Sequence, residues 1–346
     1  MKRSIPFVLL AVLLAVLAAG CGSKKNAAGT TTAASTTTTT AASSFKVGLS
    51  TDTGGLNDRS FNHLAYVGLQ RAAGELGVQT RVVTSKSPSD YIPNLTALAK
   101  QGYDLIIGVG FTEIDALKTV AKAFPKTHFS IVDVSNADEG NLKNVEGLLF
   151  KEQEAGYLAG YAAGLSAKAR GGTTVSSVGG QKQPPVDRYI AGYQAGAKAA
   201  FPAVKLINGY SQDFANQAKC KEVALNQIAA GSVVVFQVAG GCGLGALDAA
   251  KGGNVWGVGV DADQGYLGSN IISSAEKKVD VAVFNAIKNA MNGTFAAGNN
   301  VTNNVANGGI GYGKIGPAGI KFSPEIQKIY DEIKSGKISN IPNTVP

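Results

Sequence analysis

The stretch Lys46–Asn62 reads KVGLSTDTGGLNDRSFN and contains the signals of a strand, a loop and a helix start. Its first five residues form a short apolar run that is typical of a buried strand. The glycine pair that follows permits a tight loop, because glycine adopts backbone conformations that other residues avoid. Asp58 or Ser60 can then cap a helix that begins at Phe61. The stretch therefore predicts a strand, a polar loop at its carboxyl end, and a helix.

The same alternation continues along most of the chain. Apolar runs rich in β-branched residues predict strands at Lys46–Ser50, Thr80–Thr84, Leu105–Gly110, Phe129–Val134, Val145–Phe150, Thr174–Val178, Val204–Asn208, Val233–Val238, Val255–Val260 and Asn270–Ser273. Helical patterns lie between them at Phe61–Leu76, Tyr91–Gln101, Glu113–Phe124, Glu152–Ala167, Ile190–Phe201, Ala215–Ala230, Leu244–Lys251 and Val279–Met291. Continuous apolar strands that alternate with helices indicate parallel sheets covered on both faces. Because ten strands exceed what one compact sheet usually holds, we expect an α/β protein with two doubly wound lobes.

Polar, aromatic and glycine residues gather where the predicted strands end. Phe111 follows the third strand, and Asp133 ends the fourth. Two glycines follow the eighth strand, and the ninth ends on Asp261. In doubly wound folds, ligands bind outside the carboxyl ends of the strands. These residues predict a site for a flat, polar ligand, with aromatic faces for stacking and carboxylates for hydroxyl and ring N–H groups.

The first 44 residues have the composition of a targeting segment followed by a tether. Two basic residues precede the apolar run Ile5–Ala19, and Leu17–Cys21 reads LAAGC. This run is shorter than the roughly 20 apolar residues that span a bilayer, and it is typical of a secretory signal. We expect residues 1–20 to be a signal peptide and Cys21 to be lipidated, as at a bacterial lipobox, although a soluble secreted protein could carry a cysteine there. Residues 21–44, rich in Ala, Thr and Ser, should form a disordered tether to the outer face of the cell membrane.

Composition disfavours several other classes of function. The formal charge is +8, but the basic residues are scattered, so nucleic acid is not an expected partner. The two histidines lack the spacing of metal ligands, and no Gly-x-Ser-x-Gly elbow indicates a hydrolase. The run Gly241–Ala246, with Asp261 downstream, approaches a dinucleotide fingerprint; close helix packing is the competing explanation for its glycines. We expect no metal, no cofactor and no enzymatic activity, although acids at strand ends could form a glycosidase pair.

The run Thr51–Asn62 resembles the signature of the basic membrane protein family of substrate-binding lipoproteins, which includes purine nucleoside receptors of ABC importers. Further matches occur in the family's order and cover nearly all of the chain from Phe45 to about Met291. They are Gly108–Phe111, Ile131–Asp133, Glu154–Gly160, Gln237–Gly241, Gly259–Gln264 and Lys277–Val283.

This resemblance implies a type I periplasmic-binding-protein fold, with two doubly wound parallel-sheet lobes joined by a hinge of three chain crossovers. We expect residues 45–150 with 273–295 in one lobe and residues 151–272 with 296–346 in the other. The implied partners are a small ligand, with a nucleoside favoured, and an ABC transporter permease. A sugar ligand, or a sensory role for the same fold, is the alternative.

The resemblance also implies roles for individual residues in the cleft between the lobes. Phe61 and Phe214 would sandwich the base, while Asn62 and Asp133 would contact its edge. The ribose would be held by Gly240, Gly241, Asp261 and Lys277, with Lys278 as an alternative to Lys277 because the two are adjacent. Asp52 would lie beside the site.

Two cysteines remain once Cys21 is lipidated. Cys220 and Cys242 belong to a domain expected outside the cytoplasm, where disulfides persist. The matching family positions are commonly small residues other than cysteine, which favours a disulfide between these two. Two separate buried thiols are the alternative.

Overall fold

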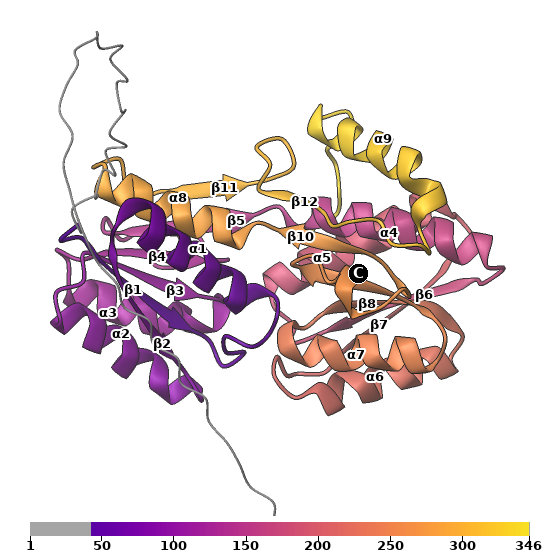
Figure 1. The fold of residues 1–346 in the computed structure, drawn as a ribbon, viewed down its shortest axis with the longest axis horizontal. Coiled ribbons are helices and arrows are strands. Elements are labelled where there is room, and N and C mark those ends of the chain that lie inside the picture. Colours follow the sequence, from indigo (N-terminus) through magenta and orange to yellow (C-terminus); the bar gives the residue numbers. More distant parts are fainter. Residues whose placement is uncertain (1–42, 346) are drawn as a thin grey trace, which may run out of the picture. The chain divides into compact units, whose positions relative to one another are not determined.

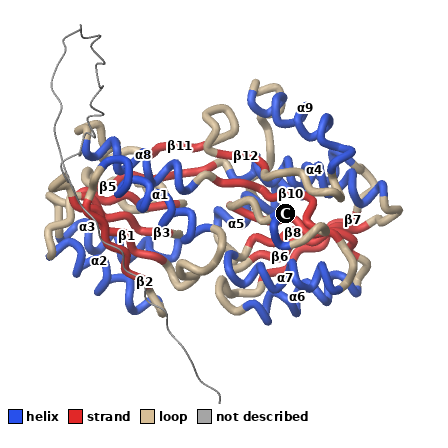
Figure 2. The backbone as a smooth tube through the Cα atoms, viewed as in Figure 1, coloured by secondary structure: helices blue, strands red, loops and turns tan. Residues whose placement is uncertain are grey.

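The computed structural model describes residues 43–345, which form two six-stranded sheets with helices packed on them (Figures 1 and 2). The predicted signal peptide, Cys21 and most of the tether lie outside the described residues. Ser43, the first described residue, contacts the first lobe: its N–H donates to Gly77 O at 3.0 Å, and Gln79 Nε2 donates to Ser43 O at 3.3 Å. The predicted tether, which ended at Ser44, is therefore two residues too long. Ser43 is already hydrogen-bonded to Gly77 and Gln79, at the start of the second strand.

The first sheet has the order β11-β5-β4-β3-β1-β2, and every neighbouring pair is parallel. Its strands are β1 (Lys46–Thr51), β2 (Gln79–Thr84), β3 (Leu105–Val109), β4 (His128–Val132), β5 (Val145–Phe150) and β11 (Asn300–Asn303). Helices α1 (Phe61–Leu76) and α8 (Val279–Met291) pack together on this sheet, and α2 (Tyr91–Lys100) packs with α3 (Ile114–Ala123) in a separate cluster.

The second sheet repeats this order as β12-β10-β9-β8-β6-β7, with only β12 antiparallel to its neighbour. Its strands are β6 (Thr174–Gly179), β7 (Lys205–Tyr210), β8 (Ser232–Val238), β9 (Trp256–Asp261), β10 (Ile271–Lys277) and β12 (Ile310–Tyr312). Helices α4 (Glu152–Ala169) and α5 (Pro184–Ala200) cross closely: a Cβ at Gly160 would lie 1.9 Å from Tyr193 O. Helices α6 (Gln217–Ala229) and α7 (Gly240–Gly252) form the other pair.

The chain passes between the lobes three times: from β5 into α4, from β10 into α8, and from β11 into β12. Two predicted boundaries differ from these positions. Residues 273–277 complete β10 in the second sheet, and residues 300–303 form β11 in the first sheet. Sequence patterns cannot assign such segments, because each becomes a strand only by pairing with an edge formed elsewhere in the chain.

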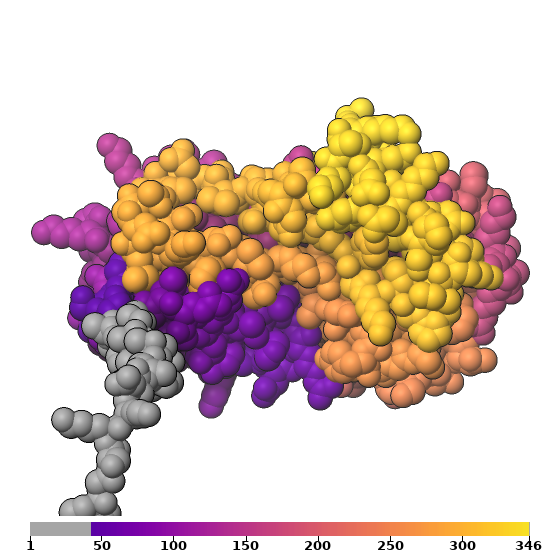
Figure 3. Space-filling model, turned by 45° about the horizontal axis from the view of Figure 1, so that its top comes forward, coloured from indigo at the N-terminus to yellow at the C-terminus, as the bar shows by residue number. Residues whose placement is uncertain are grey.

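Three C-terminal elements were not expected. β11 and β12 are short and lie in a segment rich in Asn and Gly, which have low strand propensity. Helix α9 (Ser323–Lys334) packs on α4 through the buried Ile326, Ile329 and Ile333. In the space-filling view this C-terminal segment (yellow) lies over the second lobe (Figure 3). Across residues 43–345, no helix has the length and apolar character needed to cross a membrane.

Candidate ligand-binding cleft

A cleft lies where the carboxyl ends of the two sets of strands face each other, and it encloses about 560 Å³ between protein atoms, part of it open to solvent. Its walls come from both lobes. They are formed by Asp52, Gly54, Asp58, Phe61, Asn62, Gly110, Phe111, Asp133, Gln183, Pro185, Val186, Tyr189, Phe214, Val238, Ala239, Gly240, Val260, Asp261 and Lys277. Eight of the nine residues predicted for the ligand therefore line the cleft, and Gly241 does not.

Gly241 lies where the lobes meet. A Cβ at this position would stand 3.5 Å from Asp58 Cα in the first lobe and 3.4 Å from Phe214 O in the second. The glycines that follow allow close packing of α7. A Cβ at Gly243 would lie 1.7 Å from Gln237 Oε1, and a Cβ at Gly245 would lie 2.0 Å from Gln217 O. Close packing thus accounts for this glycine run without a dinucleotide.

The β1–α1 loop of the first lobe is held by one carboxylate. Asp58 Oδ1 accepts the backbone N–H groups of Ser60 and His63, both at 3.0 Å, and Oδ2 accepts that of Asn62 at 2.8 Å. Asp58, and not Ser60, therefore caps α1. Burial raises the pKa of Asp58, and these three N–H groups oppose the shift. The capping fixes the first turn of α1, which carries Phe61.

Asp52 and Asn62 form a buried pair on the same wall. Asn62 Nδ2 donates to Asp52 Oδ1 at 2.8 Å, and the N–H of Gly54 donates to the same oxygen at 2.8 Å. Burial raises the pKa of Asp52 to about 6, although both hydrogen bonds lower it. Within residues 43–345, Asn62 Oδ1 is buried and has no hydrogen-bond partner. Its amide oxygen is thus oriented and available to accept a hydrogen bond.

Lys277 lies at the centre of a buried charge cluster. Its Nζ donates to Asp133 Oδ2 at 2.8 Å and Oδ1 at 3.0 Å, and it lies 3.5 Å from Glu152 Oε1. Burial lowers the pKa of Lys277, but Asp133, Glu152 and Asp261 outweigh that effect and raise it, so the ammonium stays charged. Glu152 is itself paired with Arg188 Nε at 2.6 Å. The adjacent Lys278 is partly exposed and pairs with Glu276, so Lys277 is the lysine that faces the cleft.

Aromatic rings surround this ammonium. Lys277 Nζ lies 4.7 Å from the ring centre of Phe61, 5.2 Å from that of Phe150 and 5.5 Å from that of Tyr189. Such distances allow cation–π attraction, which grows when the cation is desolvated. The contact with Phe61 links the first turn of α1 to the second sheet.

Two aspartates stand at equivalent ends of the two sheets. Asp133 follows β4 with φ of 73°, and Asp261 ends β9 with φ of 60°. Aspartate tolerates this left-handed conformation better than most residues. Burial raises the pKa of Asp133 to about 7, against the lowering effect of Lys277. The backbone thus turns at the same point of each sheet and directs a carboxylate into the cleft.

Asp261 also joins the lobes. Its Oδ2 accepts the hydroxyl of Ser60 from the first lobe at 2.6 Å, and its Oδ1 accepts that of Tyr189 at 3.1 Å. Burial raises the pKa of Asp261, while Lys277 and these two hydroxyls lower it. The lobes are therefore in direct contact across the cleft.

The second aromatic wall is Phe214, in the loop between β7 and α6. A Cβ at Gly180 would lie 2.3 Å from its ring, so only glycine leaves room for the ring there. Phe214 O accepts the N–H of Cys242 at 2.9 Å. The loop is held further by Asp213, which accepts the N–H groups of Ala215 and Asn216, both at 2.9 Å.

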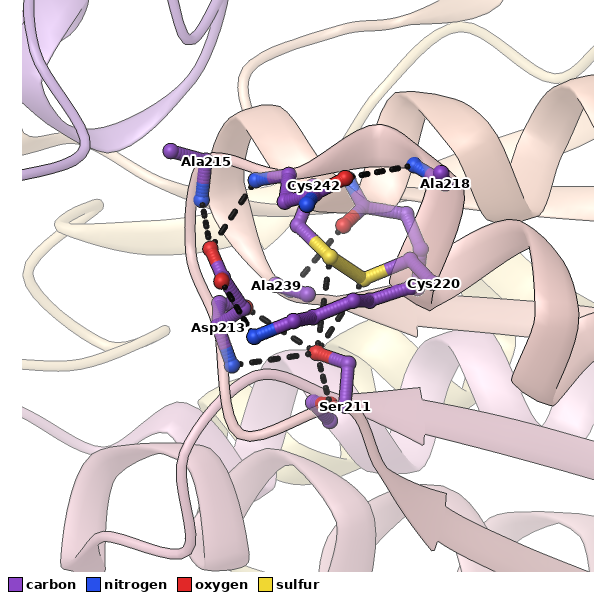
Figure 4. Close-up of a disulfide and its surroundings, with 11 residues drawn as sticks. Ser211, Asp213, Ala215, Ala218, Cys220, Ala239 and Cys242 are labelled. Carbon is purple, nitrogen blue, oxygen red and sulfur yellow. Dashed lines mark hydrogen bonds and ion pairs between the residues drawn. A yellow bond between two sulfur atoms is a disulfide. The ribbon is translucent and has the colours of Figure 1, made fainter.

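A disulfide between Cys220 and Cys242 braces the same loop (Figure 4). Their Cα atoms are 5.5 Å apart, within the usual range for a disulfide. Ser211 Oγ lies 3.3 Å from one sulfur and 3.4 Å from the other, at the start of the Phe214 loop. The bridge thus ties α6, which follows the Phe214 loop, to α7.

Sequence reasoning missed Gln183, Pro185, Val186 and Tyr189, all from one segment of the second lobe. The pattern predicted that this helix starts at Ile190, but α5 begins at Pro184. Proline favours the first turn of a helix, because its N–H is missing where no partner is needed. That signal would have placed the first turn, and Tyr189 after it, beside the cleft.

The histidines show no shared site. His63 is exposed on α1, and His128 stacks on Phe295 with ring centres 4.6 Å apart. Among residues 43–345, no three His, Cys, Asp or Glu side chains are grouped as metal ligands.

The family described as "ABC transporter substrate-binding protein PnrA-like" matches residues 45–342. The chain belongs to this family. It is 35% identical over 360 residues to "ABC transporter nucleoside-binding protein BmpA" of Lactococcus lactis, with 98% of each chain covered. It is also 32% identical to "Basic membrane protein A1" of Borrelia garinii, with 87% of this chain and 88% of the relative covered.

A solved structure of ABC transporter solute-binding proteins from Aeropyrum pernix K1 superposes with a TM-score of 0.78 at 28% identity, covering 86% of this chain and 94% of the other. The predicted family resemblance and the type I periplasmic-binding-protein fold are thus confirmed. The family is one of substrate-binding proteins of ABC transporters.

Proposed function

We propose that this chain is a lipid-anchored, extracytoplasmic protein that captures a purine nucleoside between its lobes and delivers it to the permease of an ABC importer. One observation carries the ligand class. Two phenylalanines from opposite lobes, Phe61 and Phe214, line one cleft together with carboxylates from both sheets. The Lactococcus relative, whose name states nucleoside binding, supports the same ligand.

The base would lie between the two rings, with Asn62 Oδ1 as an acceptor for a ring or exocyclic N–H. Stacking on an aromatic ring contributes about 1–3 kcal/mol per base. Two rings and a few hydrogen bonds to charged groups can therefore supply the approximately 8 kcal/mol of a micromolar complex. The ribose would lie towards Asp261 and Lys277, whose side chains supply acceptors and a donor for its hydroxyls.

Binding would act by favouring the closed arrangement of the lobes. Phe61 and Phe214 belong to different lobes, so a ligand touches both only when they approach each other. A ligand shifts such an equilibrium by its differential affinity for the two states. The permease would then distinguish the loaded from the empty protein by shape.

Titration calorimetry with adenosine, guanosine and inosine tests the ligand class. We expect saturable binding of at least one nucleoside at micromolar concentration or below. Binding of a pentose or hexose, with none of the three nucleosides bound, would replace the nucleoside by a sugar and leave the fold unaffected.

The proposed division between base and ribose can be tested with Asp261→Asn. This change should weaken adenosine binding much more than adenine binding, because only adenosine carries the ribose. The matched variant Phe61→Ala should weaken both, since it removes a stacking face. Equal losses of adenosine and adenine in Asp261→Asn would contradict the ribose contact.

The membrane anchor is tested by Cys21→Ser, at a residue outside the described part of the chain. The variant should take up no labelled palmitate and should leave the membrane fraction. Continued labelling would contradict lipidation at Cys21.

A further inference from the structure

A second groove lies beside the ligand cleft, on the other side of the β1–α1 loop. It encloses about 1090 Å³ between protein atoms, including open solvent. Its walls include Leu56 and Arg59 from the first lobe, and Leu244, Lys251 and Leu267 from the second. We call it the lateral groove. Because both lobes contribute a wall, its width depends on how the lobes are closed.

Consecutive residues of the β1–α1 loop line the two cavities. Asp58 lines the ligand cleft, and Arg59 lines the lateral groove. The hydroxyl of Ser60 donates to Asp261 across the lobes, and Gln264 Nε2 donates to Arg59 O at 3.4 Å. Arg59 is therefore fixed against the second lobe by the same contacts that close the cleft. The position of Arg59 relative to Lys251 thus reports whether the lobes are closed.

The free charge of the lateral groove is positive. Within residues 43–345, the side chains of Arg59 and Lys251 make no hydrogen bond or ion pair. Among the described residues that line it, the one acid is Asp248, which pairs with Lys221 at 2.7 Å. The same wall carries four leucines, Leu56, Leu244, Leu247 and Leu267. Two unpaired cations beside these leucines suit an acidic segment that also carries apolar side chains, because such a segment complements both features.

An exposed tyrosine is the chain neighbour of one wall residue of this groove. Tyr266 precedes Leu267 in the turn after β9, and 63% of its surface is accessible. Tyrosine and arginine are enriched at protein interfaces, where each gives a large contact area and a polar handle. An open groove with walls from two lobes fits a protein segment better than a small molecule, which would need an enclosing pocket.

We propose that the lateral groove is the docking surface for an acidic extracytoplasmic segment of the importer's permease. The inference rests on the proposed function, which supplies the permease as partner. Docking there selects the closed, loaded protein, because Arg59 and Lys251 belong to different lobes. The contact combines ion pairs to Arg59 and Lys251 with apolar packing on the leucines of the wall.

A photo-crosslinking amino acid at position 266, in the full lipid-anchored chain in cells, tests the surface directly. The expected adduct joins the chain to the permease, and added inosine increases its yield. Position 320 is the matched control, since Ile320 has a similar exposed fraction of 60%. An adduct with a second copy of this chain, or equal permease adducts from both positions, would overturn the proposal.

Charge reversal gives a second test that does not depend on the crosslink. Arg59→Glu with Lys251→Glu should lower inosine uptake at least about tenfold, while inosine affinity by calorimetry changes little. The control, Lys100→Glu with Lys205→Glu, changes the net charge equally, also with one residue in each lobe, and should retain uptake. Tyr266→Ala should reduce uptake in the same direction and keeps the proposal testable if the double variant does not fold.

These readouts separate the two proposals. If wild-type protein binds no nucleoside in calorimetry, the proposed ligand is wrong, and the crosslink at position 266 still tests docking. If nucleosides bind and neither the reversal nor Tyr266→Ala changes uptake, the lateral groove is not the docking surface. A reversal that abolishes inosine binding itself would also overturn the proposal, because the residues would then serve the ligand.

Discussion

The two lobes share one strand order, but their cleft walls come from different loops. In the first lobe, the long loop between β1 and α1 supplies Asp52 and Asp58, and the first residue of α1 is Phe61. At the same place in the second lobe, β6 ends in two glycines, and the aromatic wall comes from the next loop along the sheet. Gly180 leaves the space into which the ring of Phe214 packs. The shared topology thus places the cleft wall at the carboxyl ends of the strands, while the local sequence decides which loop forms it.

The lobes are alike where the backbone itself must turn. β4 and β9 hold the same place in their sheets, and each leads to an aspartate with positive φ. The two carboxylates nevertheless have different partners: Asp133 holds Lys277, whereas Asp261 holds Ser60 and Tyr189. Both sets of partners cross or approach the lobe boundary. The shared turn therefore positions the carboxylate in each lobe, and residues of the opposite lobe supply one of its partners.

The largest effect on stability should follow from removing the positive charge of Lys277, which lies near both aspartates. Lys277→Met leaves Asp133 and Glu152 buried without their ammonium, and the free energy of unfolding should fall by about 3–5 kcal/mol. Denaturant unfolding measures the loss. The adjacent Lys278→Met removes a partly exposed lysine and should change stability by less than about 1 kcal/mol. Equal midpoints for Lys277→Met and the wild type would show that the cluster does not hold the lobes.

The next largest effect should follow from opening the disulfide, which lies in the second lobe. Replacing Cys220 and Cys242 by serine opens a loop of 22 residues, which should lower stability by about 3 kcal/mol in the chain-entropy model. Hydrogen exchange should quicken in the Phe214 loop and α6 and stay unchanged around α1 in the first lobe. Thiol counting on unfolded native protein checks the bridge itself, and two free thiols there would refute it.

The aromatic walls offer a matched pair of variants. Phe61→Ala and Phe214→Ala should each weaken inosine binding by about 1–3 kcal/mol in calorimetry. Gly180→Ala should weaken binding as well, although it keeps both rings, because its methyl group would occupy the space of the Phe214 ring. Full affinity in Gly180→Ala would mean that the position of this ring does not matter to the ligand.

The smallest effect should come from single hydroxyls on Asp261. Ser60→Ala removes a bond between lobes, and Tyr189→Phe removes one within the second lobe, each worth about 1–2 kcal/mol. Only Ser60→Ala should increase the distance between lobes in the unliganded protein, as measured by fluorescence transfer between labels on α2 and α6. Equal opening in both variants would contradict the separate roles of the two hydroxyls.

Much of this architecture was predictable from short-range patterns. The strands and most helices follow from apolar periodicity, and the strand-end aspartates follow from local turn chemistry. The sequence also placed the helix cap at Asp58 or Ser60, and the structure selected Asp58. The runs Thr51–Asn62 and Lys277–Val283 also carried the family resemblance, which supplied the site residues. These features depend on a few neighbouring residues, so the sequence alone determined them.

Other features depend on segments that meet only in the folded chain. Lys277 pairs with Asp133, 144 residues away, and Ser60 meets Asp261 across 201 residues. The assignment of β11 to the first sheet, the position of Gly241 outside the cleft wall and the lateral groove belong to the same class. Tertiary structure decided them, because the partner of a buried charge or an edge strand is set by how two sheets pack, and no local pattern encodes that packing.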